Sequence, residues 1–242
     1  MHILITGASK GIGRAIAFKA ASSGMFDKII INSRSNEAGL EETARLAGKA
    51  SESENLIIHK SLGDLGSISY VRRLREEVGP VDVLINNAAV SYVGLLVDMT
   101  PEEWNESINT NLSSIYNTCH TFLPDMIAKQ SGHIINISSV WGEAGASCEV
   151  AYSATKGAIN SFTRALAKEV GPSCIQVNAI APGIVDTEMN SHLSAEELSK
   201  ICEDIPMGRM AKADEIADAA INILRMPKYL TGEIIRIDGG WI

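Results

Sequence analysis

The chain opens with a short apolar segment that leads directly into a glycine-rich turn. Residues 2–5 are His-Ile-Leu-Ile, and Gly7, Gly11 and Gly13 follow at close spacing. Glycine permits a tight turn and a close approach of backbone to ligand, and the amides at the start of the next helix attract an anion. An ordinary loop between a strand and a helix seldom carries three glycines at this spacing. The pattern therefore predicts a β-strand, a phosphate-binding turn and a helix.

Similar apolar runs recur along the chain and alternate with longer helical patterns. We expect strands at 2–5, 28–32, 55–59, 81–85, 132–137, 174–180 and 233–238. Strands that alternate with helices form a parallel sheet covered on both faces. The 242 residues include 45% hydrophobic residues and contain no repeat or linker-like stretch. We predict one doubly wound α/β domain over residues 1–242, with a mostly parallel seven-stranded sheet and ligands at the carboxyl ends of its strands.

Charge and composition argue against several classes of protein. A net charge of -8 without a basic run argues against nucleic acid as the main partner. The four cysteines are widely spaced, so neither a disulfide framework nor a metal site is indicated. The first predicted strand begins at residue 2, and no apolar run approaches the ~18 residues that span a bilayer. We therefore expect a soluble, cytoplasmic protein that does not bind membranes.

A second informative pattern is Tyr152 followed by Lys156, with Ser139 thirteen residues before the tyrosine. Residues four apart lie on the same face of a helix. The lysine charge is therefore expected to favour phenolate and to lower the tyrosine pKa from about 10. Such a tyrosine can exchange a proton with a carbonyl or alcohol oxygen that the Ser139 hydroxyl holds. A tyrosine and a lysine at this spacing also occur on solvated helix faces, so the pair gains weight only beside the glycine turn.

Taken together, these motifs resemble the short-chain dehydrogenase/reductase family. The glycine spacing G-x-x-x-G-x-G is that of the family rather than the common fingerprint G-x-G-x-x-G. The Asn-Asn-Ala-Ala turn at 86–89 matches as well, and the resemblance runs from residue 2 to the C-terminus. It implies a Rossmann-type, NADP-dependent oxidoreductase that acts on a CH-OH or C=O group. The implied catalytic residues are Asn111, which helps to hold a water beside the lysine, Ser139, Tyr152 and Lys156.

The end of the second predicted strand bears on the choice of cofactor. An NAD site usually presents Asp or Glu there, about 20 residues after the glycines, but residues 31–35 are Ile-Asn-Ser-Arg-Ser. Arg34 can bind a 2′-phosphate through charge-assisted hydrogen bonds, and Lys10 adds a second positive charge. A solvated surface arginine is the alternative. We predict NADP(H) as the cofactor.

The resemblance also implies a set of cofactor contacts. Ser61 and Leu62 stand where many relatives place an Asp against the adenine, and the stretch 182–189 resembles the segment that orients the nicotinamide. The full implied set is Gly7, Ser9, Lys10, Gly11, Ile12, Gly13, Arg34, Ser61, Leu62, Asn87, Ala88, Ala89, Tyr152, Lys156, Pro182, Gly183, Ile184 and Thr187. Residues from about 190 to 208 carry helix signals but no strand pattern, and we expect them to form a mobile lid over the substrate.

Within the family, residues 101–105, 109–114, 205–209 and 237–241 resemble bacterial 3-oxoacyl-acyl-carrier-protein reductases. The resemblance implies reduction of a 3-oxoacyl thioester in fatty acid biosynthesis and docking of acyl carrier protein. It also implies a homotetramer or dimer built on helices at 101–128 and 150–171 and on the C-terminal strand. The arginines that dock the acidic carrier protein are missing, because residues 129–131 are Lys-Gln-Ser and residues 171–173 are Gly-Pro-Ser. Only Lys129 remains basic.

Other substrates therefore stay open. Residues 140–150 also resemble a branch of these reductases proposed to reduce a ketone on a modified lysine of elongation factor P. Glu143 and Glu149 in this segment can face a cationic substrate or can equally be solvated loop carboxylates. A small carbonyl compound is a further alternative. A non-catalytic NADP-binding sensor is the alternative of a different class, although such a sensor would not need the four catalytic residues as a set.

Overall fold

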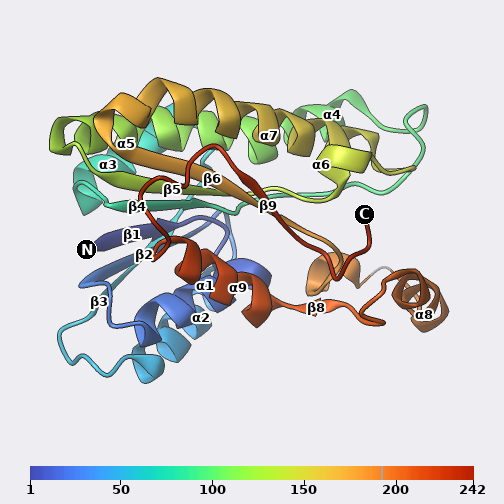
Figure 1. Ribbon diagram of the computed structural model, residues 1–242, viewed down its shortest axis with the longest axis horizontal. Helices are drawn as coiled ribbons and strands as arrows, with labels where there is room; N and C mark the ends of the chain where they lie inside the picture. The colour runs from blue at the N-terminus through green and yellow to red at the C-terminus, as the bar shows by residue number, and fades with distance from the viewer. Residues whose placement is uncertain (192) are drawn as a thin grey trace.

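The computed structural model describes residues 1–191 and 193–242, and it shows a parallel sheet between two layers of helices (Figure 1). The seven strands lie in the order β3-β2-β1-β4-β5-β6-β9, and all of the pairings are parallel. Their bounds are β1 His2–Ile5, β2 Lys28–Ser33, β3 Ile57–Leu62, β4 Val83–Asn86, β5 Gly132–Ile137, β6 Ile175–Pro182 and β9 Ile234–Ile237. The strand order reverses between β1 and β4, which opens a crevice at the carboxyl ends of these strands.

Helices cover both faces of the sheet (Figure 1). One layer contains α1 (Gly11–Ser22), α2 (Glu37–Ala50) and α9 (Ala213–Ile223), and the other contains α3 (Ile68–Val78), α5 (Ser114–Lys129) and α7 (Val150–Val170). Side chains alternate between the faces of a strand. Accordingly, Ile3 and Ile5 belong to the apolar core on the α1 side, whereas Leu4 belongs to the core on the α5 side. Burial on both faces explains why the central strands are almost entirely apolar.

Shorter elements follow the carboxyl ends of the strands. They are α4 (Pro101–Ile108), the π-helical turn η1 (Asn109–Ser113), α6 (Trp141–Ala144), η3 (Glu188–Asn190), α8 (Ala195–Asp204) and the small sheet of β7 (Val185–Asp186) and β8 (Ala211–Lys212). A 3-10 turn, η2 (Gly171–Ser173), leads instead into the amino end of β6. Thr100 and Ser194 form capping boxes that begin α4 and α8. No described helix is long and apolar enough to cross a membrane.

The predicted fold class and all seven strands are confirmed, with two differences in detail. The third strand begins at Ile57 and continues to Leu62, beyond the predicted 55–59. It is an edge strand that contains polar residues, so its apolar run is shorter than its hydrogen-bonded ladder. The helix expected over 101–128 is interrupted by the π-helical turn η1, a local insertion that apolar periodicity does not reveal.

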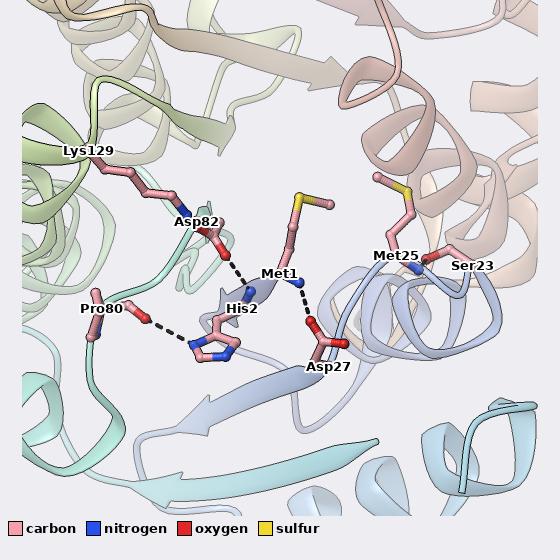
Figure 2. Close-up of polar contacts among 8 residues, drawn as sticks. All are labelled: Met1, His2, Ser23, Met25, Asp27, Pro80, Asp82 and Lys129. Carbon is pink, nitrogen blue, oxygen red and sulfur yellow. Dashed lines mark hydrogen bonds and ion pairs between the residues drawn. The ribbon is translucent and has the colours of Figure 1, made fainter. Parts of the chain in front are cut away.

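The amino end of the sheet is tied together by charged groups (Figure 2). The Met1 α-amino group lies 2.5 Å from the Asp27 carboxylate, and the His2 amide donates to Asp82 over 2.7 Å. Lys129, at the end of α5, contacts the second carboxylate oxygen of Asp82. The positive charge of Lys129 is therefore paired with Asp82 at the amino ends of the strands, on the opposite side of the sheet from the crevice.

Candidate active site

Two cavities join at the carboxyl ends of the strands. The outer cavity, of about 410 Å³, lies along the glycine turn and the end of β2. The inner cavity, of about 330 Å³, lies between the end of β5, α7 and the segment after β6. The residues that line both are Ile12, Asn87, Ala89, Thr187 and Met189. The two cavities therefore adjoin along these shared walls.

The glycine turn is packed too closely for side chains at two of its positions. A Cβ atom on Gly7 would lie 2.8 Å from Ala88 Cα, and one on Gly13 would lie 2.4 Å from the Gly7 carbonyl oxygen. Gly7 also has a φ of +62°, which favours glycine. Among the described residues, no side chain caps the first turn of α1, so its amides remain available to an anion. The turn therefore fits the phosphates of a dinucleotide.

Asn87 and Thr6 hold the glycine turn against the loop that follows β4. The Asn87 side-chain amide donates to the Thr6 carbonyl over 2.9 Å and to the Gly7 carbonyl over 3.1 Å. The Thr6 hydroxyl accepts the Asn87 and Ala88 amides over 2.8 and 3.0 Å. These bonds fix the backbone of both segments, which explains why Asn87 and Ala88 lie on the cleft although their side chains need not contact a ligand.

Ser139, Tyr152 and Lys156 all line the inner cavity. Ser139 follows β5, whereas Tyr152 and Lys156 lie one turn apart on α7, and Lys156 Nζ lies 5.3 Å from the centre of the Tyr152 ring. The neighbouring Ser138 uses its hydroxyl to bond Asn160 Oδ1 over 2.6 Å. Both serines line the inner cavity, but the Ser138 hydroxyl is engaged by Asn160, so the role of Ser139 in holding a substrate oxygen stays a prediction.

Burial acts strongly on the two titratable groups of this site. It raises the pKa of the Tyr152 phenol, the Glu149 carboxylate raises it further, and a hydrogen bond with Ser139 offsets part of the shift. Burial also lowers the pKa of Lys156 to about 7, while Lys156 Nζ donates to the Ile137 carbonyl over 2.7 Å. The prediction that Lys156 lowers the pKa of Tyr152 was wrong for the chain by itself, because burial disfavours the charged form of both groups. The Tyr152 phenol is therefore neutral near pH 7.

Asn111 lies in the π-helical turn, buried and outside both cavities. Its side-chain oxygen accepts the Val90 amide over 2.8 Å, and its amide nitrogen donates to the Val90 carbonyl over 2.9 Å and to Thr155 Oγ1 over 3.1 Å. The side chain thus joins the loop after β4 to α7, one residue before Lys156. A role in holding a water stays a prediction.

The segment after β6 forms the far wall of the inner cavity. Pro182, Gly183, Ile184 and Thr187 line it, as the predicted nicotinamide segment requires. A Cβ atom on Gly183 would lie 2.9 Å from Asp238 Cα, so this position packs tightly against the segment after β9. Asn190, Leu193 and Ile201 line the same cavity from the predicted lid at about 190–208. Position 192 within that lid lies outside the described residues.

The outer cavity contains both basic residues that were predicted to bind phosphate. Arg34 and Lys10 line it, together with Ser9 and Gly11. Each cation is already paired with a carboxylate: Arg34 Nη1 lies 2.7 Å from Glu106 Oε1, and Lys10 Nζ lies 2.8 Å from Glu188 Oε2.

Two expected adenine contacts do not lie on this cavity. Gly63 and Asp64 line it in their place. The Ser61 hydroxyl is bonded to the Tyr70 hydroxyl over 2.6 Å, and Leu62 is 47% exposed at the end of β3. These two expected contacts are therefore wrong for this cavity, because both residues still belong to β3 and the cavity is lined by the residues that follow it.

Sequence reasoning missed Thr110. It lines the outer cavity, and its buried hydroxyl has no hydrogen-bond partner among the described residues. Its place beside the predicted Asn111 is the only sequence signal that points to it. An unpartnered buried hydroxyl at this position suits a polar edge of a bound nucleotide.

The comparisons with known proteins agree with this geometry. The family model described as short chain dehydrogenase matches residues 1–198. The chain belongs to this family. It is 40% identical over 240 residues to the uncharacterized oxidoreductase YmfI of Bacillus subtilis, covering 98% of this chain and 97% of that protein. It is 37% identical over 239 residues to the 3-oxoacyl-[acyl-carrier-protein] reductase FabG of Escherichia coli, covering 98% and 95%.

Solved structures of family members have the same architecture. A 3-oxoacyl-[acyl-carrier protein] reductase from Brucella melitensis aligns with a TM-score of 0.92 at 30% identity, covering 100% of this chain and 91% of that one. A second such reductase from Brucella melitensis, with bound NAD, aligns with a TM-score of 0.90 at 29% identity, again covering 100% and 91%. The predicted family resemblance is therefore confirmed, and the protein is an oxidoreductase that acts on a carbonyl group.

Proposed function

We propose that the protein uses NADPH to reduce the ketone of a 3-oxoacyl thioester to a secondary alcohol. The observation that carries this proposal is the meeting of Ser139, Tyr152 and Lys156 in a cavity that adjoins the one along the glycine turn. A cofactor-binding sensor would need the turn but not the three side chains. Membership of a family of oxidoreductases also supports catalysis over a sensor role.

Each of the three side chains has a distinct task in this reaction. NADPH supplies a hydride for the carbonyl carbon. The Ser139 hydroxyl donates a hydrogen bond to the carbonyl oxygen, and the neutral Tyr152 phenol gives its proton to that oxygen as negative charge develops. The charge of Lys156, 5.3 Å from the ring centre, stabilises the phenolate that remains.

The choice of NADP(H) rests on the end of β2. Arg34 and Lys10 place two positive charges on the outer cavity, and the stretch after β2 contributes no carboxylate of its own. A guanidinium binds a phosphate through paired, charge-assisted hydrogen bonds. Because Arg34 is also paired with Glu106, the strength of the preference for NADPH over NADH depends on both residues.

A second candidate substrate is a ketone that carries an amine, such as the ketone on a modified lysine of elongation factor P. Glu149 lines the inner cavity, held by a 2.6 Å hydrogen bond from Ser91 Oγ. Lys129, the one basic residue left at the carrier-protein positions, is occupied by Asp82 at the opposite edge of the sheet. Glu143 lies outside the cavity, 3.9 Å from the Arg236 guanidinium.

These candidates can be separated by following NADPH oxidation with three kinds of ketone: an acetoacetyl thioester on coenzyme A or on acyl carrier protein, a neutral small ketone, and an amino-ketone of similar length. We expect turnover of the thioester to exceed that of the neutral ketone. If the amino-ketone is preferred, and Glu149→Gln removes that preference without slowing the neutral ketone, the second candidate replaces the first. Absence of turnover with every ketone would contradict the assignment as a ketone reductase.

A further inference from the structure

The Arg34–Glu106 ion pair joins the end of β2 to α4, beside the cavity in which the cofactor is proposed to bind. Arg34 follows β2, on one side of the reversal in strand order, and Glu106 lies on α4, on the other side. Arg34 Nη1 and Glu106 Oε1 are 2.7 Å apart. The end of β2 carries no carboxylate of its own. Glu106 of α4, 72 residues from Arg34 along the chain, brings a carboxylate to Arg34.

Glu106 is held in this position from two sides. The Tyr92 hydroxyl donates to Glu106 Oε2 over 2.7 Å while Arg34 occupies Oε1. The hydrogen bond from Tyr92 and the contact with Arg34 lower the pKa of Glu106, so the group is ionised near neutral pH. By contrast, Glu188, the carboxylate that pairs with Lys10, is 69% exposed, and water screens it more strongly.

A cofactor 2′-phosphate that binds Arg34 must therefore share the guanidinium with the Glu106 carboxylate. Glu106 competes for the guanidinium and repels the phosphate, and Asp64 adds a second carboxylate to the electrostatic surroundings of Arg34. A cofactor that lacks the 2′-phosphate meets neither effect. Glu106 thus cancels part of the contribution that Arg34 makes to the selectivity for NADPH over NADH.

We propose that Glu106 is a specificity-determining residue that acts through Arg34 and limits the preference of the enzyme for NADPH over NADH. This inference rests on the proposed binding of NADP(H) in the outer cavity. It makes the balance between Arg34 and Glu106, rather than Arg34 alone, the determinant of cofactor choice.

The test measures the dissociation constants of NADPH and NADH for the full-length protein and for Glu106→Gln. We expect the ratio of the two constants to move toward NADPH by about fivefold, the order of effect of one partly exposed charge pair. Adenosine 2′,5′-bisphosphate and adenosine 5′-monophosphate should show the same change, because they differ only in the 2′-phosphate. Glu102→Gln removes the same charge from an exposed position on the same helix, and it should leave the ratio within about twofold.

The route through Arg34 is tested by a double-mutant cycle. In the Arg34→Ala background, Glu106→Gln should move the ratio by clearly less than in the natural chain, because only the direct repulsion between Glu106 and the phosphate remains. A Glu106→Gln protein that binds NADPH more weakly relative to NADH would overturn the inference, since Glu106 would then orient Arg34 for the phosphate. If Arg34→Ala weakens NADPH and NADH equally, the proposed NADP(H) site itself fails, and this outcome is distinct from a failure of Glu106 alone.

Discussion

Tyr152 and Lys156 occupy the same face of α7, and burial drives both toward their neutral forms. The pKa of Tyr152 is raised and the pKa of Lys156 is lowered to about 7. A neutral phenol is the form that can donate a proton during reduction. A lysine that titrates near pH 7 can change its charge within the working range of the enzyme.

The shift of Lys156 predicts how stability depends on pH. Between the folded pKa of about 7 and the ordinary value of 10.5, the unfolded chain binds more protons at this residue than the folded chain does. The free energy of unfolding contributed by Lys156 therefore rises with pH across this window. We expect Lys156→Met to raise the free energy of unfolding at pH 7, where the buried ammonium destabilises the fold, and to have little such effect near pH 10.5.

Denaturant unfolding of both proteins at several pH values measures this effect. The gain in stability of Lys156→Met over the natural chain should shrink by at least about 1 kcal/mol between pH 7 and pH 10. Lys49→Met, which removes an exposed lysine from α2, serves as the control, and the change with pH for Lys156→Met should exceed the change for this variant. A constant difference for Lys156→Met would mean that its ammonium is not disfavoured by burial.

At the scale of residues, the motif predicts which side chains to consider, whereas their burial and surroundings depend on the fold. Ser139, Tyr152 and Lys156 could be identified because their types and spacing are fixed by the motif. The direction of the Tyr152 pKa could not, because it depends on burial that spacing does not report. Thr110 was missed for a similar reason, since it joins the cavity only through the π-helical turn.

At the scale of elements, the glycine turn makes the sharpest structural prediction. A Cβ atom on Gly13 would lie 2.4 Å from the Gly7 carbonyl oxygen and 2.6 Å from Asn87 Nδ2. We expect Gly13→Ala to destabilise the protein by about 1–3 kcal/mol, as overpacking does, and to weaken NADPH binding, although alanine normally favours a helix.

Gly48→Ala is the matched control for this change. Gly48 lies within α2, and a Cβ atom there would meet only Ile58 Cδ1 at 3.9 Å, an ordinary contact distance. Its replacement should leave stability unchanged or slightly higher. Thermal unfolding and NADPH titration of both variants provide the comparison. Equal stability of the two variants would show that the turn can move apart, and that close packing is not what requires glycine at position 13.

Elements were predicted better than their boundaries. The central strands β4 and β5 were recovered because burial on both faces makes them continuous apolar runs. The edge strand β3 was displaced because its ladder includes the polar stretch His59-Lys60-Ser61.

At the scale of the whole molecule, alternation of strands and helices was sufficient to predict a doubly wound sheet. Contacts at the cleft were not predictable, because Arg34–Glu106 and Lys10–Glu188 join residues from distant segments. The contact between Lys129 and Asp82 was not predictable either, because these residues meet only once α5 packs beside the amino end of the folded sheet. The homotetramer also stays a prediction, and exposed apolar side chains on and before α4 and α5, such as Leu95, Val97 and Tyr116, are compatible with it.

The central claim is that this cleft reduces a ketone with Tyr152 as the proton donor. Its most direct test is NADPH oxidation by Tyr152→Phe with the best ketone substrate, measured beside NADPH binding and beside Tyr116→Phe as an exposed control. We predict that Tyr152→Phe lowers kcat by about 10²- to 10⁴-fold while its affinity for NADPH stays within about threefold of the natural value, since the glycine turn is untouched. Turnover by Tyr152→Phe at more than a tenth of the natural rate would contradict the account.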